Sequence, residues 1–412
     1  MSAQIDSKKT VFNTAMLYLM TAAKLIFPLV TLPYLCRVLT VDSYGVVTYV
    51  KSCMTYFQLF IDFGFILSAV KDIVDANEDN DKIGYITGQV IVARLCLSAA
   101  SFVVLIIISL AIPLLRVNFL YTLLSFIVVA MSSFLLDFLY RGIEKMHLIA
   151  TVFVSMKSIS TLFTFVVVKD DSDLLLIPIL DIISTLVAIV INIIQLNKLQ
   201  IKIRFENFKT SFDMIKNSWT YFISNMATTA FSVLNTVLIG IFITPKEVAF
   251  WGVSLQLISA VQNFYTPINN GIYPQMIKAK SFAPIKKILM IFMPIVIAGC
   301  VFVFVLSEPI ITIISGEQYA GAVPVFRALI PVLFFSFPGM LLGWPTLGAI
   351  GKVAETTRTT VITAIVQCAG LGLLIVFDAF TLMNVAIFRC ITEALLMILR
   401  ASYCFKFRSE FQ

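Results

Sequence analysis

The stretch NTAMLYLMTAAKLIFPLVTLPYLCRVLTVDSYGVVTYVKSCMTYFQLFIDFGFILSAV, which runs from Asn13 to Val70, decides the fold of this chain. It holds two apolar segments, residues 13–35 and 46–70, joined by a short polar turn. A helix needs about 20 residues to cross the roughly 30 Å hydrocarbon core of a bilayer, so each segment is long enough to span it. We therefore expect the chain to begin with a transmembrane helical hairpin.

Neither of these segments is uniformly apolar. The first carries Lys24 near its middle. The second carries polar residues whose spacing of three and four places them on one face of a helix, namely Lys51, Thr55, Gln58 and Asp62. A lysine or aspartate facing lipid near the bilayer centre would cost about 2.5–3.5 kcal/mol. This pattern predicts a cavity lined by polar side chains.

The composition of the whole chain extends this reading. Of its 412 residues, 59% are hydrophobic and 13% are charged, whereas a soluble globular chain is about 45–50% apolar and about 25% charged. The composition predicts an all-α polytopic membrane protein. The seven cysteines are scattered without a C-x-x-C motif, and the single histidine, His147, has no cysteine or second histidine nearby. We therefore expect no metal and no other bound cofactor.

Apolar segments recur along the chain and predict about 12 transmembrane helices, with an uncertainty of one or two. They lie at residues 13–35, 46–70, 84–112, 118–140, 148–168, 174–196, 218–243, 248–274, 288–307, 323–347, 359–377 and 380–404. The longest break between them is basic and amphipathic. It predicts an N-terminal six-helix lobe over residues 1–197, a cytoplasmic linker over 198–217 and a C-terminal six-helix lobe over 218–412. The linker is expected to form a helix on the anionic inner leaflet, and specific docking to a partner is the alternative.

The two halves show signs of an internal repeat. Residues 39–46 follow the first apolar segment, and residues 243–250 follow the seventh at an offset of 204. The seventh and eighth segments also carry polar residues at helical spacing: Asn225, Thr228, Ser232 and Asn235, and then Gln256, Ser259, Asn263, Thr266 and Asn270. Six spans per half is an even number, so the repeat is expected to run parallel, about an axis along the membrane normal.

The distribution of basic residues predicts the orientation. With the N-terminus inside, the inner segments hold 19 lysines and arginines and the outer loops hold 4. This asymmetry predicts that both termini are cytoplasmic. The net charge of +7 then follows from the topology, and no nucleic acid is expected as a partner.

Several charged residues inside the expected spans have ready structural explanations. Arg389 and Glu393 lie four positions apart and can form an ion pair. Arg400, Asp137 and Arg141 lie close to the inner surface, and Asp181 lies near the outer one, where such side chains can reach water or a partner.

Four deeper cations lack an acidic residue three or four positions away: Lys24, Lys51, Arg94 and Lys157. Two interpretations stay open. They can pair across helices with Asp62 or Asp181, or together they can form a cationic cavity that binds an anionic head group such as a pyrophosphate. Asp62 is the candidate for coupling to an ion or proton. Amides suited to sugar hydroxyls complete the candidate site: Gln58, Asn225, Asn235, Gln256 and Asn263. Hydrogen bonding between helices is the ordinary use of such residues in membrane proteins and stays open as the alternative.

The sequence resembles the Wzx-like (RfbX-like) polysaccharide repeat-unit flippases of the multidrug/oligosaccharidyl-lipid/polysaccharide (MOP) exporter superfamily. The matching segments are spread over nearly the whole chain. They are FPLVTLPYL at 27–35 with Arg37-Val38-Leu39, Tyr44-Gly45, Asp62-Phe63-Gly64-Phe65, Lys71-Asp72-Ile73, Arg141-Gly142-Ile143-Glu144-Lys145-Met146, Tyr273-Pro274 and the stretch from Gly316 to Arg327.

This resemblance implies two six-helix lobes around a central cavity that opens alternately to the two sides of a bacterial cytoplasmic membrane. The implied cargo is an oligosaccharide on polyprenyl pyrophosphate, carried from the inner to the outer leaflet for O-antigen, capsule or exopolysaccharide synthesis. Lys24 and Lys51 match positions where such transporters place cavity cations. Membrane lipid and other polysaccharide-assembly proteins are the implied partners, a single chain is expected to function as a monomer, and the coupling ion, a proton or sodium, is left open.

Two other functions compete with this one. A cation-coupled multidrug antiporter of the same superfamily would favour an acidic cavity, but the spans hold seven cations and four anions. A membrane-embedded polysaccharide polymerase would need a sizeable loop for its chemistry, whereas the longest break here is about 21 residues and shows no acid pair or nucleotide-binding loop. The sequence therefore favours a transporter over an enzyme.

Overall fold

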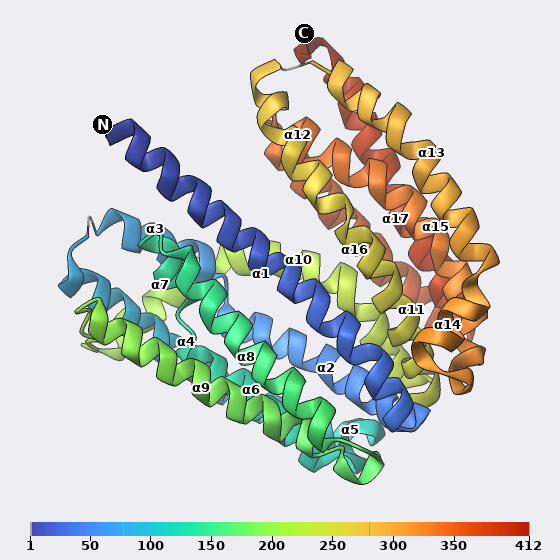
Figure 1. Ribbon diagram of the computed structural model, residues 1–412, viewed down its shortest axis with the longest axis horizontal. Coiled ribbons are helices and arrows are strands. Elements are labelled where there is room, and N and C mark those ends of the chain that lie inside the picture. The colour runs from blue at the N-terminus through green and yellow to red at the C-terminus, as the bar shows by residue number, and fades with distance from the viewer. Residues whose placement is uncertain (1, 77, 280, 412) are drawn as a thin grey trace. The chain divides into compact units, whose positions relative to one another are not determined.

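A computed structural model describes residues 2–76, 78–279 and 281–411, and all regular structure in these ranges is helical (Figure 1). The chain divides into two compact units. Unit 1 comprises Met1–Ser43 and Val50–Met226, and unit 2 comprises Tyr44–Tyr49 and Ala227–Gln412. An all-α fold is therefore confirmed.

Unit 1 holds the first nine α-helices and the start of the tenth, except that residues 44–49 of the second helix belong to unit 2. Their bounds are α1 Ser2–Val38, α2 Val41–Asp62, α3 Phe65–Asp75, α4 Asn80–Ala111, α5 Pro113–Val117, α6 Phe119–Met131, α7 Asp137–Gly142, α8 Met146–Val167, α9 Leu176–Lys198 and α10 Phe208–Phe242. Short 3-10 turns, Ser132–Phe134 and Asp171–Asp173, precede α7 and α9. Helix α10 continues without a break into unit 2.

Unit 2 holds the rest of α10 and seven further α-helices. They are α11 Pro245–Asn263, α12 Tyr265–Ala279, α13 Ala283–Val305, α14 Ser307–Ser315, α15 Val323–Leu341, α16 Val353–Val376 and α17 Leu382–Lys406. A 3-10 segment, Glu317–Ala322, leads into α15, a π-helical segment, Leu342–Gly348, follows it, and a 3-10 turn, Arg408–Glu410, follows α17.

Hydroxyl and carboxylate side chains begin several of these helices. Thr40 caps α2 by accepting a hydrogen bond from the Ser43 N–H, and Asp79 caps α4 in the same way. Thr244 forms a reciprocal capping box with Glu247 at the start of α11. Such caps satisfy backbone donors that have no partner inside the helix. They fix where the polar turns end and the long helices begin.

Ten helical segments of the described residues are long and apolar enough to span a membrane, six in the first half and four in the second. The expected spans at 218–243 and 248–274 are not among the ten. They coincide with α10 and with α11 and α12, which are helical but carry the polar series noted in the sequence. The chain is a multi-pass membrane protein.

The order of helices repeats between the two halves. A long helix, a capped helix and a shorter helix (α1, α2 and α3) correspond to α10, α11 and α12, and α4 to α6 correspond to α13 to α15. The helix breaks correspond as well. Residues 132–136 interrupt the expected span at 118–140, and the π-helical segment interrupts the expected span at 323–347.

These breaks expose backbone carbonyl groups, which side chains of other helices or of the break itself satisfy. In unit 1 the Arg94 guanidinium donates to the Leu135 carbonyl at 3.0 Å. In unit 2 Arg400 donates to the Gly339 carbonyl at 2.7 Å, and the Thr346 hydroxyl donates to the Leu341 carbonyl, which Pro345 cannot reach because it has no N–H. An unpaired carbonyl in hydrocarbon is costly, so each break requires such a donor.

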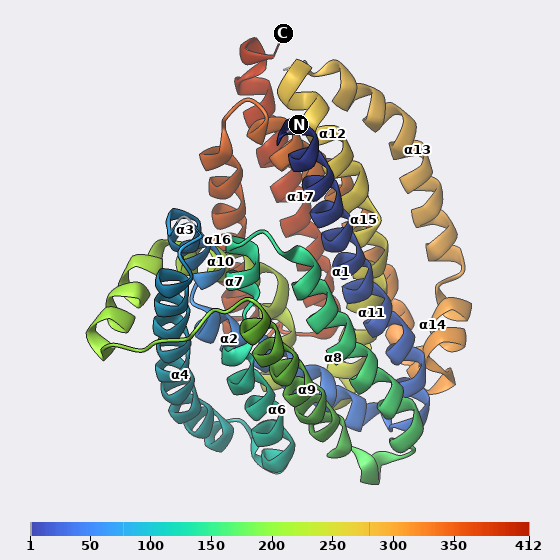
Figure 2. The ribbon, with the colours of Figure 1, turned by 60° about the vertical axis from the view of Figure 1, so that its left-hand side comes forward.

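Each unit has its own packing centre. In unit 1, α1 packs on α8, α8 on α9 and α3 on α7, as Figures 1 and 2 show. In unit 2, α15 lies between α11, α13 and α17 and has the most extensively buried helix surface, with Leu329, Val332 and Phe337 nearly inaccessible. These packed helices hold the polar side chains described below.

Candidate functional site

Helix α2 carries the polar series that the sequence singled out, and it is fixed at both ends. Beyond the Thr40 cap, it ends where Phe63 and Gly64 both adopt left-handed backbone conformations, with φ of 39° and 81°. A side chain at Gly64 would collide with the backbone of α10 at Tyr221 and Phe222. The chain therefore turns sharply after Asp62 and holds that carboxylate at the end of the helix.

The first cluster, which we call the Asp62 cluster, joins four elements of unit 1. The Arg94 guanidinium of α4 lies 3.0 Å from the Asp62 carboxylate, and the Gln58 amide donates to the other carboxylate oxygen at 2.9 Å. The Ser132 hydroxyl, at the break after α6, donates to Gln58 at 3.0 Å. Arg94 also stacks over Phe138, 5.1 Å from the ring centre. Asp62 is therefore paired across helices.

Arg94 and Asp62 differ in their access to solvent. The Arg94 side chain is 3% exposed, whereas the Asp62 side chain is 38% exposed. Asp137 of α7 lies within electrostatic range of Arg94, Arg141 and Lys24. The Asp62 cluster thus combines a buried guanidinium with a carboxylate that water or an ion can reach.

The second cluster, the Lys51 cluster, lies nearer the start of α2. Eleven residues separate Lys51 from Asp62, about 16 Å at 1.5 Å per residue. Lys51 lies within electrostatic range of Lys157 and Asp181. Lys157 of α8 and Asp181 of α9 form an ion pair at 3.6 Å, and the Ser160 hydroxyl donates to the same carboxylate at 2.7 Å.

The four expected cavity cations therefore fall into two kinds. Arg94 and Lys157 each pair with a carboxylate of another helix, which is one of the two arrangements that the sequence left open. Lys51 and Lys24 are exposed, and neither has a carboxylate within ion-pair distance among the residues that the structure describes. Lys24 lies over the Phe153 ring, 5.4 Å from its centre.

Counting both clusters, the membrane zone of unit 1 gathers five cations and three anions. They are Lys24, Lys51, Arg94, Arg141 and Lys157, with Asp62, Asp137 and Asp181. The surplus positive charge resides on residues that a ligand can reach. A set of this kind attracts an anionic group and disfavours a cation.

The amide candidates occupy different surroundings. Asn235 of α10 is 1% exposed and accepts a hydrogen bond from Gln367 of α16 at 2.7 Å. Gln367 in turn accepts from the Thr392 hydroxyl of α17, so these three side chains link three helices of unit 2. Asn263 is exposed and donates to the Ser259 carbonyl of its own helix. Asn225 and Gln256 are partly buried.

Three of the charged residues given a structural explanation from the sequence have partners within unit 2. Arg389 and Glu393 form an ion pair at 3.0 Å in the interior of unit 2. Arg400 hydrogen-bonds to α15 and α16. Sequence reasoning missed Ser132 and the Leu135 carbonyl, because it treated residues 118–140 as one unbroken span. The Ser132-Ser133 pair was the signal available, since serine pairs are frequent at sharp helix kinks.

Comparison with known proteins gives this arrangement its context. Residues 11–280 match the model of a family described as polysaccharide biosynthesis protein. A Shigella dysenteriae protein named "Putative O-antigen transporter" is 24% identical over 323 residues, which cover 75% of this chain and 78% of the relative. A protein of the same name from Escherichia coli K12 is 23% identical over 335 residues, which cover 78% and 79% of the two chains.

Solved structures agree on the fold. The eukaryotic MATE transporter AtDTX14 matches with a TM-score of 0.61 and 12% identity, covering 96% of both chains. An outward-facing multidrug resistance MATE transporter of the MOP superfamily matches with a TM-score of 0.52 and 14% identity, covering 97% of both chains. The family match spans well over half of the sequence. This chain is thus a member of the polysaccharide biosynthesis protein family, with the fold of the MOP superfamily, as its sequence motifs indicated.

Proposed function

We propose that this protein carries a polyprenyl-pyrophosphate-linked oligosaccharide from the inner to the outer leaflet of the bacterial cytoplasmic membrane. The observation that carries the proposal is the surplus of accessible positive charge in the membrane zone of unit 1. Lys24 and Lys51 are available to a ligand because the nearby carboxylates of Asp62 and Asp181 already pair with Arg94 and Lys157. The family and its relatives named as O-antigen transporters support this choice of cargo.

The energetic problem of transport explains the need for such cations. A pyrophosphate cannot enter about 30 Å of hydrocarbon without partners that replace its hydration. A lysine about 4 Å from a phosphate contributes about 1 kcal/mol in a water-filled site and about 4 kcal/mol near the protein surface. Lys24 and Lys51 therefore supply the attraction that replaces part of the hydration of the pyrophosphate, while the prenyl chain stays in lipid.

Alternating access between two lobes is the mechanism that we propose. The repeated order of helices in the two halves supports it, because transporters with internal repeats move one repeat against the other. Asp62 is the proposed coupling residue. Protonation of its carboxylate would remove the charge that pairs with Arg94 at 3.0 Å and would free the guanidinium for the head group. We place both termini in the cytoplasm, on the 19 to 4 asymmetry of basic residues.

The test is to locate lipid-linked repeat units in cells that lack the protein, with a membrane-impermeant reagent that oxidises sugars. We expect the units to accumulate on the protected inner face and to reach the outer face when the wild-type gene is restored. Lys24→Ala and Lys51→Ala should each slow this transfer about tenfold, which corresponds to about 1.4 kcal/mol. Lys82→Ala is the matched control, because that lysine, in the first turn of α4, is 70% exposed and pairs with the helix-capping residue Asp79.

Two outcomes would overturn the proposal. Unpolymerised units on the outer face of the null strain would indicate a polymerase. Normal transfer of repeat units in the null strain, together with loss of cation efflux, would indicate a drug antiporter. The variants must reach wild-type levels in the membrane for the comparison to count.

A further inference from the structure

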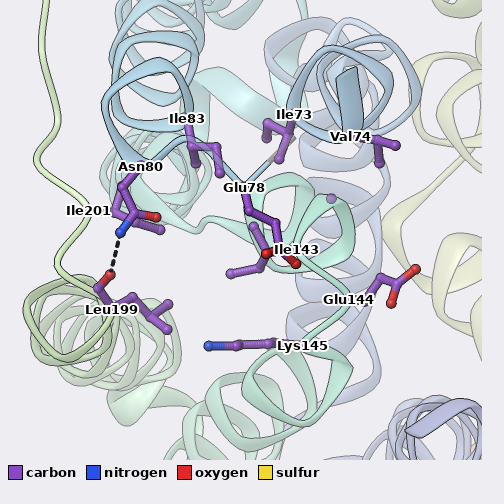
Figure 3. A pocket seen from close by; sticks show the side chains of 11 residues that line it. Ile73, Val74, Glu78, Asn80, Ile83, Ile143, Glu144, Lys145, Leu199 and Ile201 are labelled. Carbon is purple, nitrogen blue, oxygen red and sulfur yellow. Dashed lines mark hydrogen bonds between the residues drawn. The ribbon is translucent and has the colours of Figure 1, made fainter. Parts of the chain in front are cut away.

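A cavity separate from the two charged clusters opens at one end of unit 1 (Figure 3). It has a volume of about 560 Å³ and lies between the α3–α4 loop, the α7–α8 loop and the segment that follows α9. The residues that line it are Ile73, Val74, Glu78, Asn80, Ile83, Gly142, Ile143, Glu144, Lys145, Leu199 and Ile201.

These lining residues lie at the boundary between apolar helices and polar loops. Candidate membrane spans end at Asp75, Gly142 and Lys198, and others begin at Asn80 and Met146. The cavity therefore lies at the depth where the head groups of phospholipids are found. Its apolar wall includes the buried residues Ile73, Ile83 and Ile201.

Two opposite charges project toward this cavity from different loops. Figure 3 shows the side chains of Glu78 and Lys145 extending toward the space, whereas Glu144 points away from it. Neither the Glu78 carboxylate nor the Lys145 ammonium group has a hydrogen-bond or ion-pair partner within the described ranges. The two charged groups are thus available to a ligand.

The backbone holds both residues in place. Glu144 has a φ of 57°, and the Lys145 N–H donates to the Tyr140 carbonyl at 2.8 Å, a bond pattern that closes the end of α7. Glu78 has a φ of 62° in the turn that leads to the Asp79 cap of α4. The Gly142 backbone lies against Ile73, where a methyl group would collide with that side chain. Lys145 is therefore fixed at the end of α7, and Glu78 lies directly before the residue that caps α4.

The presence of one accessible cation and one accessible anion at the same cavity restricts which ligands can bind there. An anionic head group would gain Lys145 but would be repelled by Glu78, and a cationic ligand would meet the reverse problem. A head group with a phosphate and an ammonium group satisfies both charges. A primary ammonium can also donate hydrogen bonds to a carboxylate, which the methylated ammonium of choline cannot do.

We propose that this cavity binds the head group of an ethanolamine phospholipid, with its phosphate beside Lys145 and its ammonium group beside Glu78. The isoleucine wall then contacts the glycerol backbone and the first methylene groups of the acyl chains. The lipid fills the space between the three loops and links them. This site is independent of the transported substrate, since it involves neither the Asp62 cluster nor the Lys51 cluster.

The experiment uses the purified full-length chain in nanodiscs that contain equal amounts of ethanolamine, choline and glycerol phospholipids with identical acyl chains. Native mass spectrometry after partial delipidation measures which lipids stay bound. We expect the wild-type chain to retain one ethanolamine phospholipid at least tenfold in preference to the other two. Glu78→Gln and Lys145→Gln should each reduce this preference about tenfold. Glu144→Gln is the matched control and should leave it unchanged.

A charge reversal guards against variants that fail to fold. Glu78→Lys gives the cavity two cations, so it should retain the anionic glycerol phospholipid instead, a gain that an unfolded chain cannot show. Equal retention of the three lipids by the wild type would overturn the proposal. An unchanged preference in both Glu78→Gln and Lys145→Gln would overturn it as well.

Discussion

Removing the charge of Asp62 should destabilise the protein more than removing the charge of its partner, Arg94. Asp62→Asn leaves the Arg94 guanidinium, 3% exposed, without its counter-ion. Among the described residues, Arg94 then keeps only the Leu135 carbonyl, the Phe138 ring and the field of Asp137. Arg94→Gln leaves a carboxylate that is 38% exposed and still accepts from Gln58. A stranded arginine cannot lose its proton, whereas a stranded carboxylate can be hydrated.

Breaking a buried ion pair by removing one partner costs about 3–5 kcal/mol. We expect Asp62→Asn to lie at the lower end, at about 3 kcal/mol, because Arg94 keeps one carbonyl and one aromatic partner. Arg94→Gln should cost about 1.5 kcal/mol, the scale of one lost hydrogen bond to a charged group, because the glutamine amide is itself a donor that can serve the Leu135 carbonyl in place of the guanidinium. The double variant should cost no more than about 3 kcal/mol, since it leaves neither charge stranded.

The measurement is the free energy of unfolding in mixed micelles, followed by circular dichroism as the fraction of denaturing detergent rises. All three variants are compared with the wild type under identical conditions. Equal costs for the two single variants would refute the argument from exposure. An additive double variant would refute the ion pair itself.

Three further predictions concern other parts of the chain. Gly88→Ala should loosen the segment that follows α9, because the added methyl group would overlap the Arg204 carbonyl oxygen. We expect trypsin to cut this variant at Lys202 and Arg204 several-fold faster than the wild type. Gly299→Ala is the control and should leave the cleavage rate unchanged, because there is open space around Gly299. In the Asp170–Asp173 loop, burial raises the pKa of Asp171, but hydrogen bonds from Thr40 and Ser43 outweigh it and hold the pKa below its ordinary value. The ionised carboxylate therefore stabilises the fold at neutral pH. This contribution is lost as the pH falls below about 4, the ordinary pKa of an aspartate, and through the lower pKa of the folded state. Asp171→Asn should reduce the fall in melting temperature between pH 7 and pH 3, and an unchanged fall would contradict this role. Trp251→Phe should lower the free energy of unfolding by about 1–2 kcal/mol, because the Thr236 hydroxyl, buried in unit 2, loses its 3.0 Å hydrogen bond from the indole. Adding Thr236→Val should recover part of this loss. If the effects of the two substitutions were fully additive, the pairing would be contradicted.

Periodicity predicted the helical fold and the polar face of α2, because both depend on local spacing. Gln58 and Asp62 lie four positions apart, and the structure joins them by a hydrogen bond. The Arg389 and Glu393 pair was predictable for the same reason. The sequence repeat places Thr40 and Thr244 at equivalent positions in two turns, and each residue caps the helix that follows.

Contacts across helices could not be predicted from one sequence. Arg94 and Asp62 are 32 residues apart, and Lys157 and Asp181 are 24 apart. No local pattern selects these partners over Lys24 or Lys51. The break at residues 132–136 was also missed, since the segment from 118 to 140 is apolar enough to be one helix.

The missed break explains why the four candidate cations are not equivalent. Because α6 ends at Met131, the Leu135 carbonyl loses its helical partner and needs a donor. Arg94 supplies that donor, and its guanidinium is thereby held beside Asp62. An arginine with this many fixed contacts has a structural role that a lysine could not fill, because only a guanidinium can serve a carbonyl and a carboxylate from one plane. Lys24 and Lys51 serve no such carbonyl and carboxylate, so we expect a transported head group to be bound by their charges.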